Sequence, residues 1–367
     1  MILTVLFYIL IAATCIQIIY LLSFLTIFSN KKKPGNTKTN VPISVIICAK
    51  NEAKNLTEFL PFIVEQTYSN FEIILINDAS TDTTLAVMES FKEAYENIRI
   101  VDVKNNEAFW GNKKYALTLG IKAAKNEHLL FTDADCKPTS NQWIQEISST
   151  FSDKNSIVLG YGKYSSKKSL VNLLVRFETL LTALQYFTYA KFGSPYMGVG
   201  RNLAYTKSEF FKTKGFINHI NVKSGDDDLF IQEAATKTNT TFNTNENSFT
   251  ISNPPLTFKE WFRQKRRHIS TSSYYKFKHK FFLGLFFISK FIFYFLTVLL
   301  YFLFSWKFIT SILTLYIITL VIVLGISTQK LKERNLLLFF PVLDILLLLF
   351  QFTIFISNTF SKPTHWK

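Results

Sequence analysis

The chain has 367 residues, a formal net charge of +15 and 48% hydrophobic residues, enough for one large globular domain together with membrane helices. Its three cysteines do not form a disulfide framework, and no Cys/His cluster has the spacing of a zinc site. The basic residues gather beside apolar segments and are not interleaved with aromatic residues. This pattern indicates a membrane surface and a phosphate-bearing partner, and no nucleic acid.

Residues 1–28 are almost entirely apolar and contain no charged side chain. A crossing of the bilayer needs about 20 such residues, so this segment predicts a transmembrane helix. Residues 29–40 form a short polar linker that contains Lys31, Lys32 and Lys33. Positive charge marks the cytoplasmic side of a span, so we expect the N-terminus outside and the linker inside. A cleaved signal peptide fits less well, because its basic residues precede the apolar run.

The segment that follows the linker alternates between apolar strands and amphipathic helices. We expect strands at 41–49, 71–76, 98–103 and 127–132, and helices at 52–66, 80–95 and 112–125. This alternation predicts an α/β fold with a doubly wound parallel sheet and helices on both faces. Ligands bind such sheets at the carboxyl ends of the strands, where Asp78, Asp133 and Asp135 are found.

An Asp-X-Asp turn, Asp133-Ala134-Asp135, directly follows the fourth of these strands. Two carboxylates at this spacing can share one divalent cation. Hard cations such as Mg²⁺ or Mn²⁺ prefer oxygen ligands and often keep phosphate oxygens in their shell. The turn therefore indicates a metal–diphosphate site, although such pairs also occur in turns that only face solvent.

After Gly160 the strand–helix pattern changes. Residues 170–190 predict an apolar helix that suits either the protein core or a membrane surface. Further on, Asp226, Asp227 and Asp228 form a concentrated acidic cluster. Like charges raise one another's pKa, so one of these carboxylates could act as a general base. The alternative is an acidic N-cap for a helix at 229–235.

Residues 276–360 form a second apolar region, in which we expect about three transmembrane helices, at 281–304, 308–326 and 336–357. Basic residues at 276–280 and 330–334 place those two segments on the cytoplasmic side, and the tail, residues 361–367, outside. Asp344 lies within the last helix. An ionisable residue at this depth is either functional or shielded near a helix end.

Seven segments of the chain share one further pattern. They are Ile46–Glu52, Ile74–Asp82, Gly111–Leu117, Asp133–Asp135, Gly200–Tyr205, Gly225–Leu229 and Gln264–His268. In order and spacing they resemble the inverting family 2 glycosyltransferases with a GT-A fold, especially membrane-bound relatives of the cellulose and hyaluronan synthases. The resemblance covers roughly residues 41–272 and implies a GT-A catalytic domain at 41–275.

This resemblance implies an enzyme, a hexosyltransferase-like glycosyltransferase. It would move a sugar from a nucleotide-sugar donor to a membrane-associated acceptor, which could be a lipid, a lipid-linked glycan or a polysaccharide. Mg²⁺ or Mn²⁺ would assist, and one displacement would invert the anomeric carbon. We expect an integral protein of a bacterial inner (cell) membrane with its catalytic domain in the cytoplasm. The alternative is a catalytically inactive transferase-like protein that binds or transports at the bilayer.

The resemblance also implies roles for single residues on the donor side. It assigns contacts with the nucleotide sugar to Glu52, Asp78, Lys113, Asp133 and Arg267. From the residues alone, Asp78 could instead cap the next helix, and Lys113 could be a solvated helix lysine.

The metal and the base follow from the same resemblance. It implies that Asp135 binds the metal directly, with Asp133 as the second carboxylate, and that Asp227 is the general base. The register of the base is open by one residue, because Asp226 and Asp228 flank Asp227.

The acceptor side would contain Asp226, Trp261, Gln264 and His268. His268 stands where the family motif ends in Trp, the residue that stacks on the acceptor sugar in processive synthases. This difference puts processive polymer synthesis in doubt. The basic residues at 265–267 could also bind anionic lipid, and both roles can hold together.

Overall fold

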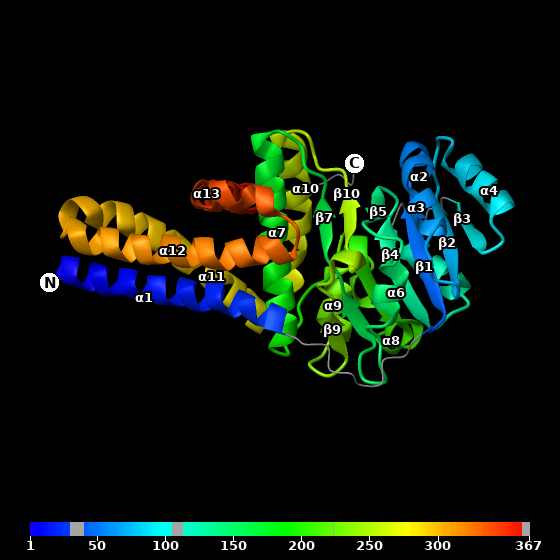
Figure 1. Cartoon of the computed structure of the whole chain (residues 1–367), viewed down its shortest axis with the longest axis horizontal. Coiled ribbons are helices and arrows are strands. Elements are labelled where there is room, and N and C mark those ends of the chain that lie inside the picture. Colours follow the sequence, from blue (N-terminus) through cyan, green and yellow to red (C-terminus); the bar gives the residue numbers. More distant parts are fainter. Residues whose placement is uncertain (30–39, 105–112, 223, 362–367) are drawn as a thin grey trace.

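The structure, a computed structural model, describes residues 1–29, 40–104, 113–222 and 224–361. The linker lysines Lys31–Lys33, and Gly111 and Asn112 of the third motif, lie outside the described residues. Figure 1 shows a long molecule with apolar helices at one end and an α/β unit at the other. Two further helices, α7 (Leu170–Lys191) and α10 (Phe258–Ser270), lie between these parts.

The α/β unit is built on a seven-stranded sheet with the order β3-β2-β1-β4-β8-β6-β9. The strands are β1 (Ile43–Ala49), β2 (Phe71–Asp78), β3 (Ile98–Val103), β4 (His128–Asp133), β6 (Ile157–Leu159), β8 (Leu203–Thr206) and β9 (Thr240–Phe242). β1 to β4 are mutually parallel, as predicted. β8 is antiparallel to both β4 and β6, so the sheet is mixed. The chain enters β8 at the edge where β4 ends, and it therefore runs back along β4.

Helices cover both faces of this sheet. The helices are α2 (Ala53–Phe59), α3 (Pro61–Val64), α4 (Thr84–Ala94), α5 (Lys113–Ala123), α6 (Trp143–Ser148), α8 (Lys207–Lys212) and α9 (Asp228–Ala234). Alternate residues of β1 face opposite cores, with Ile46 on the α5 side and Val45 on the α2 side. The helix expected at 52–66 is divided at Pro61, because proline cannot donate a helical hydrogen bond.

A small second sheet adjoins the first at the Asp-X-Asp turn. Its strands are β5 (Cys136–Pro138), β7 (Gly162–Tyr164) and β10 (Thr250–Ser252), in the order β5-β10-β7. β10 pairs with β5 in the antiparallel sense and with β7 in the parallel sense. This sheet therefore connects the turn to the segment that leads into α7.

Four helices of the described residues are long and apolar enough to cross a membrane. They are α1 (Ile2–Phe24), α11 (Phe277–Leu303), α12 (Trp306–Lys330) and α13 (Phe340–Phe360), the last preceded by the short helix η7 (Arg334–Phe339). α1 packs along α11, where Gln17 Nε2 donates to the Phe286 carbonyl at 2.8 Å and to Ser289 Oγ at 2.7 Å. Buried polar contacts of this kind hold apolar helices together in a bilayer.

The sequence left open whether the helix at residues 170–190 lies in the protein core or on a membrane surface, and the structure of α7 distinguishes the two. In Figure 1 it crosses the ends of α1 and α12, between them and the sheet. Most of its side chains are buried, including the charged Arg176 and Glu178. The helix is therefore protein core, sandwiched between the membrane helices and the α/β unit.

α13 follows a different path from the one we expected. Its first residue, Phe340, packs against Phe177 of α7 with ring centroids 5.7 Å apart. At its other end, Ser361 Oγ accepts a hydrogen bond from Arg266 of α10 at 2.8 Å. α7 and α10 both lie on the sheet side of the apolar helices (Figure 1), so both ends of α13 meet that side. This geometry differs from the expectation that residue 361 lies on the opposite side.

We expect the C-terminus and the α/β unit to lie on the same side of the membrane. An epitope tag after Lys367 and one inserted at the exposed Asp153 should react with antibody in the same preparation of sealed vesicles. A tag at Met1 should react only in vesicles of the opposite orientation, because α1 extends away from the sheet (Figure 1). Shared accessibility of the Lys367 and Met1 tags would contradict this arrangement.

Candidate active site

The turns after β1 and β2 are held together at the carboxyl edge of the sheet. Asn51 and Ala79 adopt left-handed backbone conformations there, with φ of 57° and 50°. Asn51 Oδ1 accepts from the Thr81 backbone N–H at 2.8 Å, and the Asn51 N–H donates to Ser80 Oγ at 3.0 Å. These hydrogen bonds stabilise the unfavourable left-handed conformations and fix where β1 and β2 end.

Asp78, the last residue of β2, is buried at this edge. Burial raises the pKa of its carboxyl, while Lys50, 4.0 Å away, and Lys113 oppose the rise. The N-cap residue of α4 is Thr83, and the Thr84 N–H donates to Asp82 Oδ1 at 3.0 Å. The carboxylate of Asp78 is thus not the cap of that helix.

Glu52 is the N-cap residue of α2 and lies near the end of β2, the strand that contains Asp78. Its backbone N–H donates to Thr84 Oγ1 at 2.9 Å, and its Oε2 accepts from Asn55 Nδ2 at 2.6 Å. Glu52 and Asp78 therefore border the same edge of the sheet.

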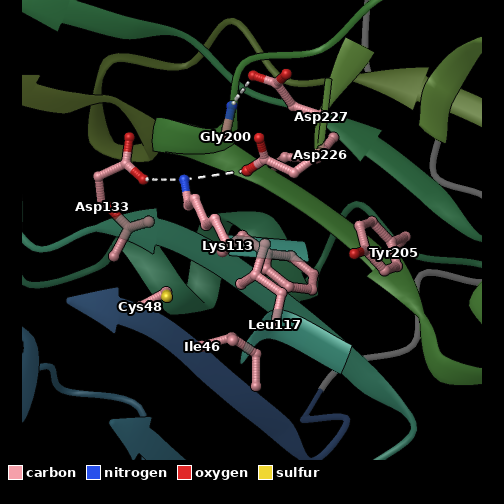
Figure 2. A pocket seen from close by; sticks show the side chains of 12 residues that line it. Ile46, Cys48, Lys113, Leu117, Asp133, Gly200, Tyr205, Asp226 and Asp227 are labelled. Carbon is pink, nitrogen blue, oxygen red and sulfur yellow. Dashed lines mark hydrogen bonds and ion pairs between the residues drawn. The ribbon is translucent and has the colours of Figure 1, made fainter. Parts of the chain in front are cut away.

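Lys113, the first residue of α5, lies between two carboxylates (Figure 2). Its Nζ is 3.0 Å from Asp133 Oδ1 and 3.0 Å from Asp226 Oδ2. Burial would lower the pKa of this amine, but the two carboxylates raise it well above its usual value. Lys113 is therefore a fixed cation that joins α5, the end of β4 and the loop before α9, and not a solvated helix lysine.

The Asp-X-Asp turn has the donor set of a hard-cation site. Ligand atoms of Asp133, Asp135 and Cys136 lie within 4.8 Å of one another. Burial raises the pKa of Asp135 to about 6, Asp133 adds to the rise, and Arg201 opposes it. Two neighbouring carboxylates suit Mg²⁺ or Mn²⁺, with further oxygen ligands supplied from outside the chain.

Cys136 does not fit that role. Burial raises the pKa of its thiol well above the usual value, so the sulfur stays protonated. The thiol instead points to Asp135 Oδ1, 3.4 Å away. Sulfur is a soft ligand and suits a hard cation poorly, so the two carboxylates are the better ligands of this group.

The three acidic residues at 226–228 have different surroundings. Burial would raise the pKa of Asp226, but the Lys113 ammonium lowers it below the usual value. Asp228 faces away from the sheet edge: its Oδ2 accepts from Thr271 Oγ1 and from Tyr275 Oη, the latter at 2.6 Å. Its Oδ1 accepts from the Leu229 N–H at 2.8 Å. Asp228 thus anchors the start of α9 to the segment before α11.

Asp227 lines a small cavity together with Lys113, Asp133 and Asp226 (Figure 2). Its Oδ2 accepts from the Gly200 N–H at 2.8 Å, and its Oδ1 from the Asp228 N–H at 2.7 Å. It is also the N-cap residue of α9, so the sequence-based alternative of a helix cap describes its place in the fold. Burial, and then the charges of Asp226 and Asp228, raise its pKa to about 7.

The expected acceptor-side residues of α10 lie at different depths. Trp261 is fully buried and stacks on Phe350 of α13, with ring centroids 3.7 Å apart. Gln264 Nε2 donates to Tyr164 Oη at 3.3 Å. Arg267 is partly buried, and His268 is exposed. Gln264 is linked to the site through Tyr164, because the Tyr164 ring also lies against Arg201.

Two cations at the site were not singled out from the sequence. Arg201 lies over the Tyr164 ring, 4.1 Å from its centroid, and its positive charge lowers the pKa of Asp135. Lys114 is buried, and its Nζ donates to the carbonyls of His219 and Val222 at 2.7 and 3.0 Å. Burial lowers the pKa of Lys114 to about 8. Lys114 and Arg201 belong to the segments Gly111–Leu117 and Gly200–Tyr205 of the family pattern. Their contacts could not be predicted, because the partner residues are distant in the sequence.

Comparison with known families agrees with this geometry. The model of "Glycosyl transferase family 2" matches residues 44–208, and that of "Glycosyl transferase family group 2" matches residues 142–356. The chain belongs to the family 2 glycosyltransferases. The predicted family is therefore confirmed.

Among individual proteins, the chain is similar to an uncharacterized glycosyltransferase of Haemophilus influenzae, with 33% identity over 40% of this chain and 42% of that protein. It is also similar to the 4,4'-diaponeurosporenoate glycosyltransferase of Staphylococcus haemolyticus, with 28% identity over 54% of this chain and 51% of that protein. The matched part spans about half or less of the length of these relatives.

One solved structure shares the overall fold. It is the mannosyltransferase PcManGT from Pyrobaculum calidifontis, in complex with GDP-Man and Mn²⁺, with a TM-score of 0.58 and 14% identity. The alignment covers 94% of this chain and 99% of that one. The predicted α/β fold of the GT-A type is confirmed, and the described residues include four helices long and apolar enough to span a membrane.

We expect Tyr275→Phe to destabilise the protein, because it removes a hydrogen bond to the buried Asp228 carboxylate. Hydrogen bonds to charged groups contribute about 1.5–3 kcal/mol. Thermal unfolding of the purified protein should show a lower midpoint. The matched control is Tyr274→Phe, since Tyr274 is 62% exposed and should tolerate the change. Equal midpoints for both variants would show that this anchor contributes little.

Proposed function

We propose that the protein is an inverting glycosyltransferase that moves a sugar from a nucleotide-sugar donor to a membrane-associated acceptor. The observation that supports this most is the grouping of Asp227, with a pKa of about 7, beside Asp226, Lys113 and the Asp133–Asp135 turn. A carboxyl group whose pKa is near neutrality is suited to act as a general base. Family membership agrees with this chemistry.

The donor binds at the carboxyl edge of β1, β2 and β4 in this proposal. Glu52 and Asp78 contact the nucleoside, and Arg267 contacts the diphosphate through its fork of donors. Asp133 and Asp135 would hold Mg²⁺ or Mn²⁺. When bound, this ion offsets the negative charge that develops on the departing diphosphate.

Asp227 provides the base. Its carboxylate takes the proton of the acceptor hydroxyl, and the hydroxyl oxygen attacks the anomeric carbon opposite the diphosphate. The new C–O bond forms as the bond to the diphosphate breaks, and the nucleoside diphosphate leaves. The hydrogen bonds from the N–H groups of Gly200 and Asp228 fix the orientation of this carboxylate. The single displacement needs no covalent intermediate with the enzyme.

The acceptor reaches this site from the membrane. Relatives of the chain are named for lipid acceptors, such as 4,4'-diaponeurosporenoate and α-D-GlcNAc-diphosphoundecaprenol, and for polymers such as poly(ribitol-phosphate). A lipid, a lipid-linked glycan or a polysaccharide fits a site next to α10. Asp226, Gln264 and His268 belong to the acceptor side of the proposal. Trp261, expected there as well, is buried against Phe350 and supports α10 without facing an acceptor.

The proposed setting is a bacterial inner membrane with the catalytic domain, residues 41–275, in the cytoplasm. The basic segments at 276–280 and 330–334 support this orientation by the positive-inside rule. In this division, residues 1–28 anchor the N-terminus, 29–40 link it to the domain, and 276–360 form the C-terminal membrane region before the tail, 361–367.

Asp227→Asn should reduce transfer by about 10²–10⁴-fold, because it removes the base with almost no change in volume. Donor affinity and the unfolding midpoint should stay close to wild type. Wild-type transfer should rise as the pH increases through about 7, since only the ionised Asp227 accepts a proton. The measurements are nucleoside diphosphate release, donor binding and thermal unfolding on the same samples.

The control is Asp153→Asn at an exposed position, which should behave as wild type. If Asp226→Asn loses transfer and Asp227→Asn does not, the base is one residue away from our assignment. A wild-type protein that releases no nucleoside diphosphate from any sugar nucleotide would favour the inactive, transferase-like alternative.

Asp135→Asn should weaken donor binding and turnover, with partial recovery at high Mn²⁺ or Mg²⁺, because one metal ligand is lost. Cys136→Ser should leave the metal dependence unchanged, since the thiol is protonated and directed at Asp135. Metal titrations of transfer and of donor binding test both variants. Full activity in excess chelator would refute the metal assignment.

A further inference from the structure

A second pocket lies away from the acidic site, at the membrane end of the α/β unit. Its volume is about 330 Å³, within the range of small-ligand sites, and it is lined by Arg176, Lys332, Arg334 and Asn335. Arg176 belongs to α7, and the other three belong to the segment between α12 and α13. Because α7 crosses the ends of the membrane helices (Figure 1), the pocket lies at the level of the membrane surface.

The back of the pocket is rigid. Arg176 is buried, and its guanidinium donates to Glu333 Oε2 at 2.8 Å and to Ser166 Oγ at 3.0 Å. Lys163 lies 3.7 Å from Glu333 Oε1, and its Nζ donates to the Lys332 carbonyl at 2.9 Å. These contacts fix the buried side of the pocket and the backbone that leads into η7, while Lys332, Arg334 and Asn335 form its exposed side.

The charge of the pocket is positive. Lys163, Arg176, Lys332 and Arg334 are basic, and the acidic partners of this group are Glu333, paired with Lys163 and Arg176, and Glu246, paired with Lys332. Four positive and two negative charges leave an excess of two positive charges. Arg334 and Asn335 are exposed at its mouth, where a planar guanidinium and an amide can both donate to one anion.

Exposed apolar side chains follow these donors directly. Leu337, Leu338 and Phe339 complete η7 and are 40%, 87% and 44% exposed. A cationic pocket bordered by exposed apolar residues at the membrane level suits an amphiphile, with its anion in the pocket and its acyl chain along η7. A soluble anion would leave these apolar side chains without a partner.

We propose that this pocket binds the phosphate group of a membrane lipid. Arginine recognises phosphate through paired N–H donors, and basic pockets beside membrane helices bind lipid head groups. The proposal depends on the membrane placement of α12 and α13. It does not depend on the sugar-transfer reaction, so the two can fail separately.

The test uses the full-length protein purified in a neutral detergent and dioctanoyl phosphatidic acid as the probe. Native mass spectrometry and the unfolding midpoint should show saturable binding. Arg334→Gln combined with Asn335→Ala should weaken binding at least tenfold. The matched control, Lys330→Gln, removes the same charge from an exposed position at the end of α12 and should bind as wild type.

Competition experiments with two compounds and the wild-type protein distinguish which part of the probe the pocket recognises. Dioctanoylglycerol, which lacks the phosphate, should not displace the probe, and inorganic phosphate should displace it only at far higher concentration. Equal competition by dioctanoylglycerol would overturn the phosphate assignment, and equal competition by inorganic phosphate would overturn the lipid assignment. Wild-type affinity in the double variant would show that the probe binds elsewhere.

Discussion

The candidate site depends on the two ion pairs of Lys113. Asp133 and Asp226 come from parts of the chain more than ninety residues apart, and their carboxylates would repel each other without the ammonium between them. The Lys113 ammonium lowers the pKa of Asp226, while burial, and then the charges of Asp226 and Asp228, raise the pKa of Asp227. One partly buried cation thus joins three elements next to the proposed base.

The same acidic cluster connects the site to the membrane helices. Asp227 lines the cavity, while Asp228, the next residue, binds Thr271 and Tyr275 just before α11 begins. A displacement of α11 would therefore be transmitted to Asp227 through a single peptide unit. The position of Asp227, the proposed base, relative to the sheet is therefore linked to the segment that leads into α11.

The sequence predicted the local structure better than the long-range contacts. A continuous β-branched run identified β1, since a fully buried parallel strand has few alternatives. The different surroundings of Asp227 and Asp228 were not predictable, because Asp228 is bound by Thr271 and Tyr275, more than forty residues later. Hydropathy likewise identified α13 as apolar, but its direction depends on contacts with α7 and α10, which composition does not encode.

The path of α13 has a physical cause within the membrane region. Asp344 is fully buried, 2.5 Å from Lys290 Nζ of α11, and its Oδ2 accepts from Tyr294 and Tyr316 at 2.9 and 2.7 Å. Of the two roles that the sequence allowed, a shielded structural one accounts for these contacts. A buried ion pair tolerates no loss of either partner, so it fixes which neighbours a helix must keep. Near its start α13 is held to α11 and α12, and at its other end it contacts α10.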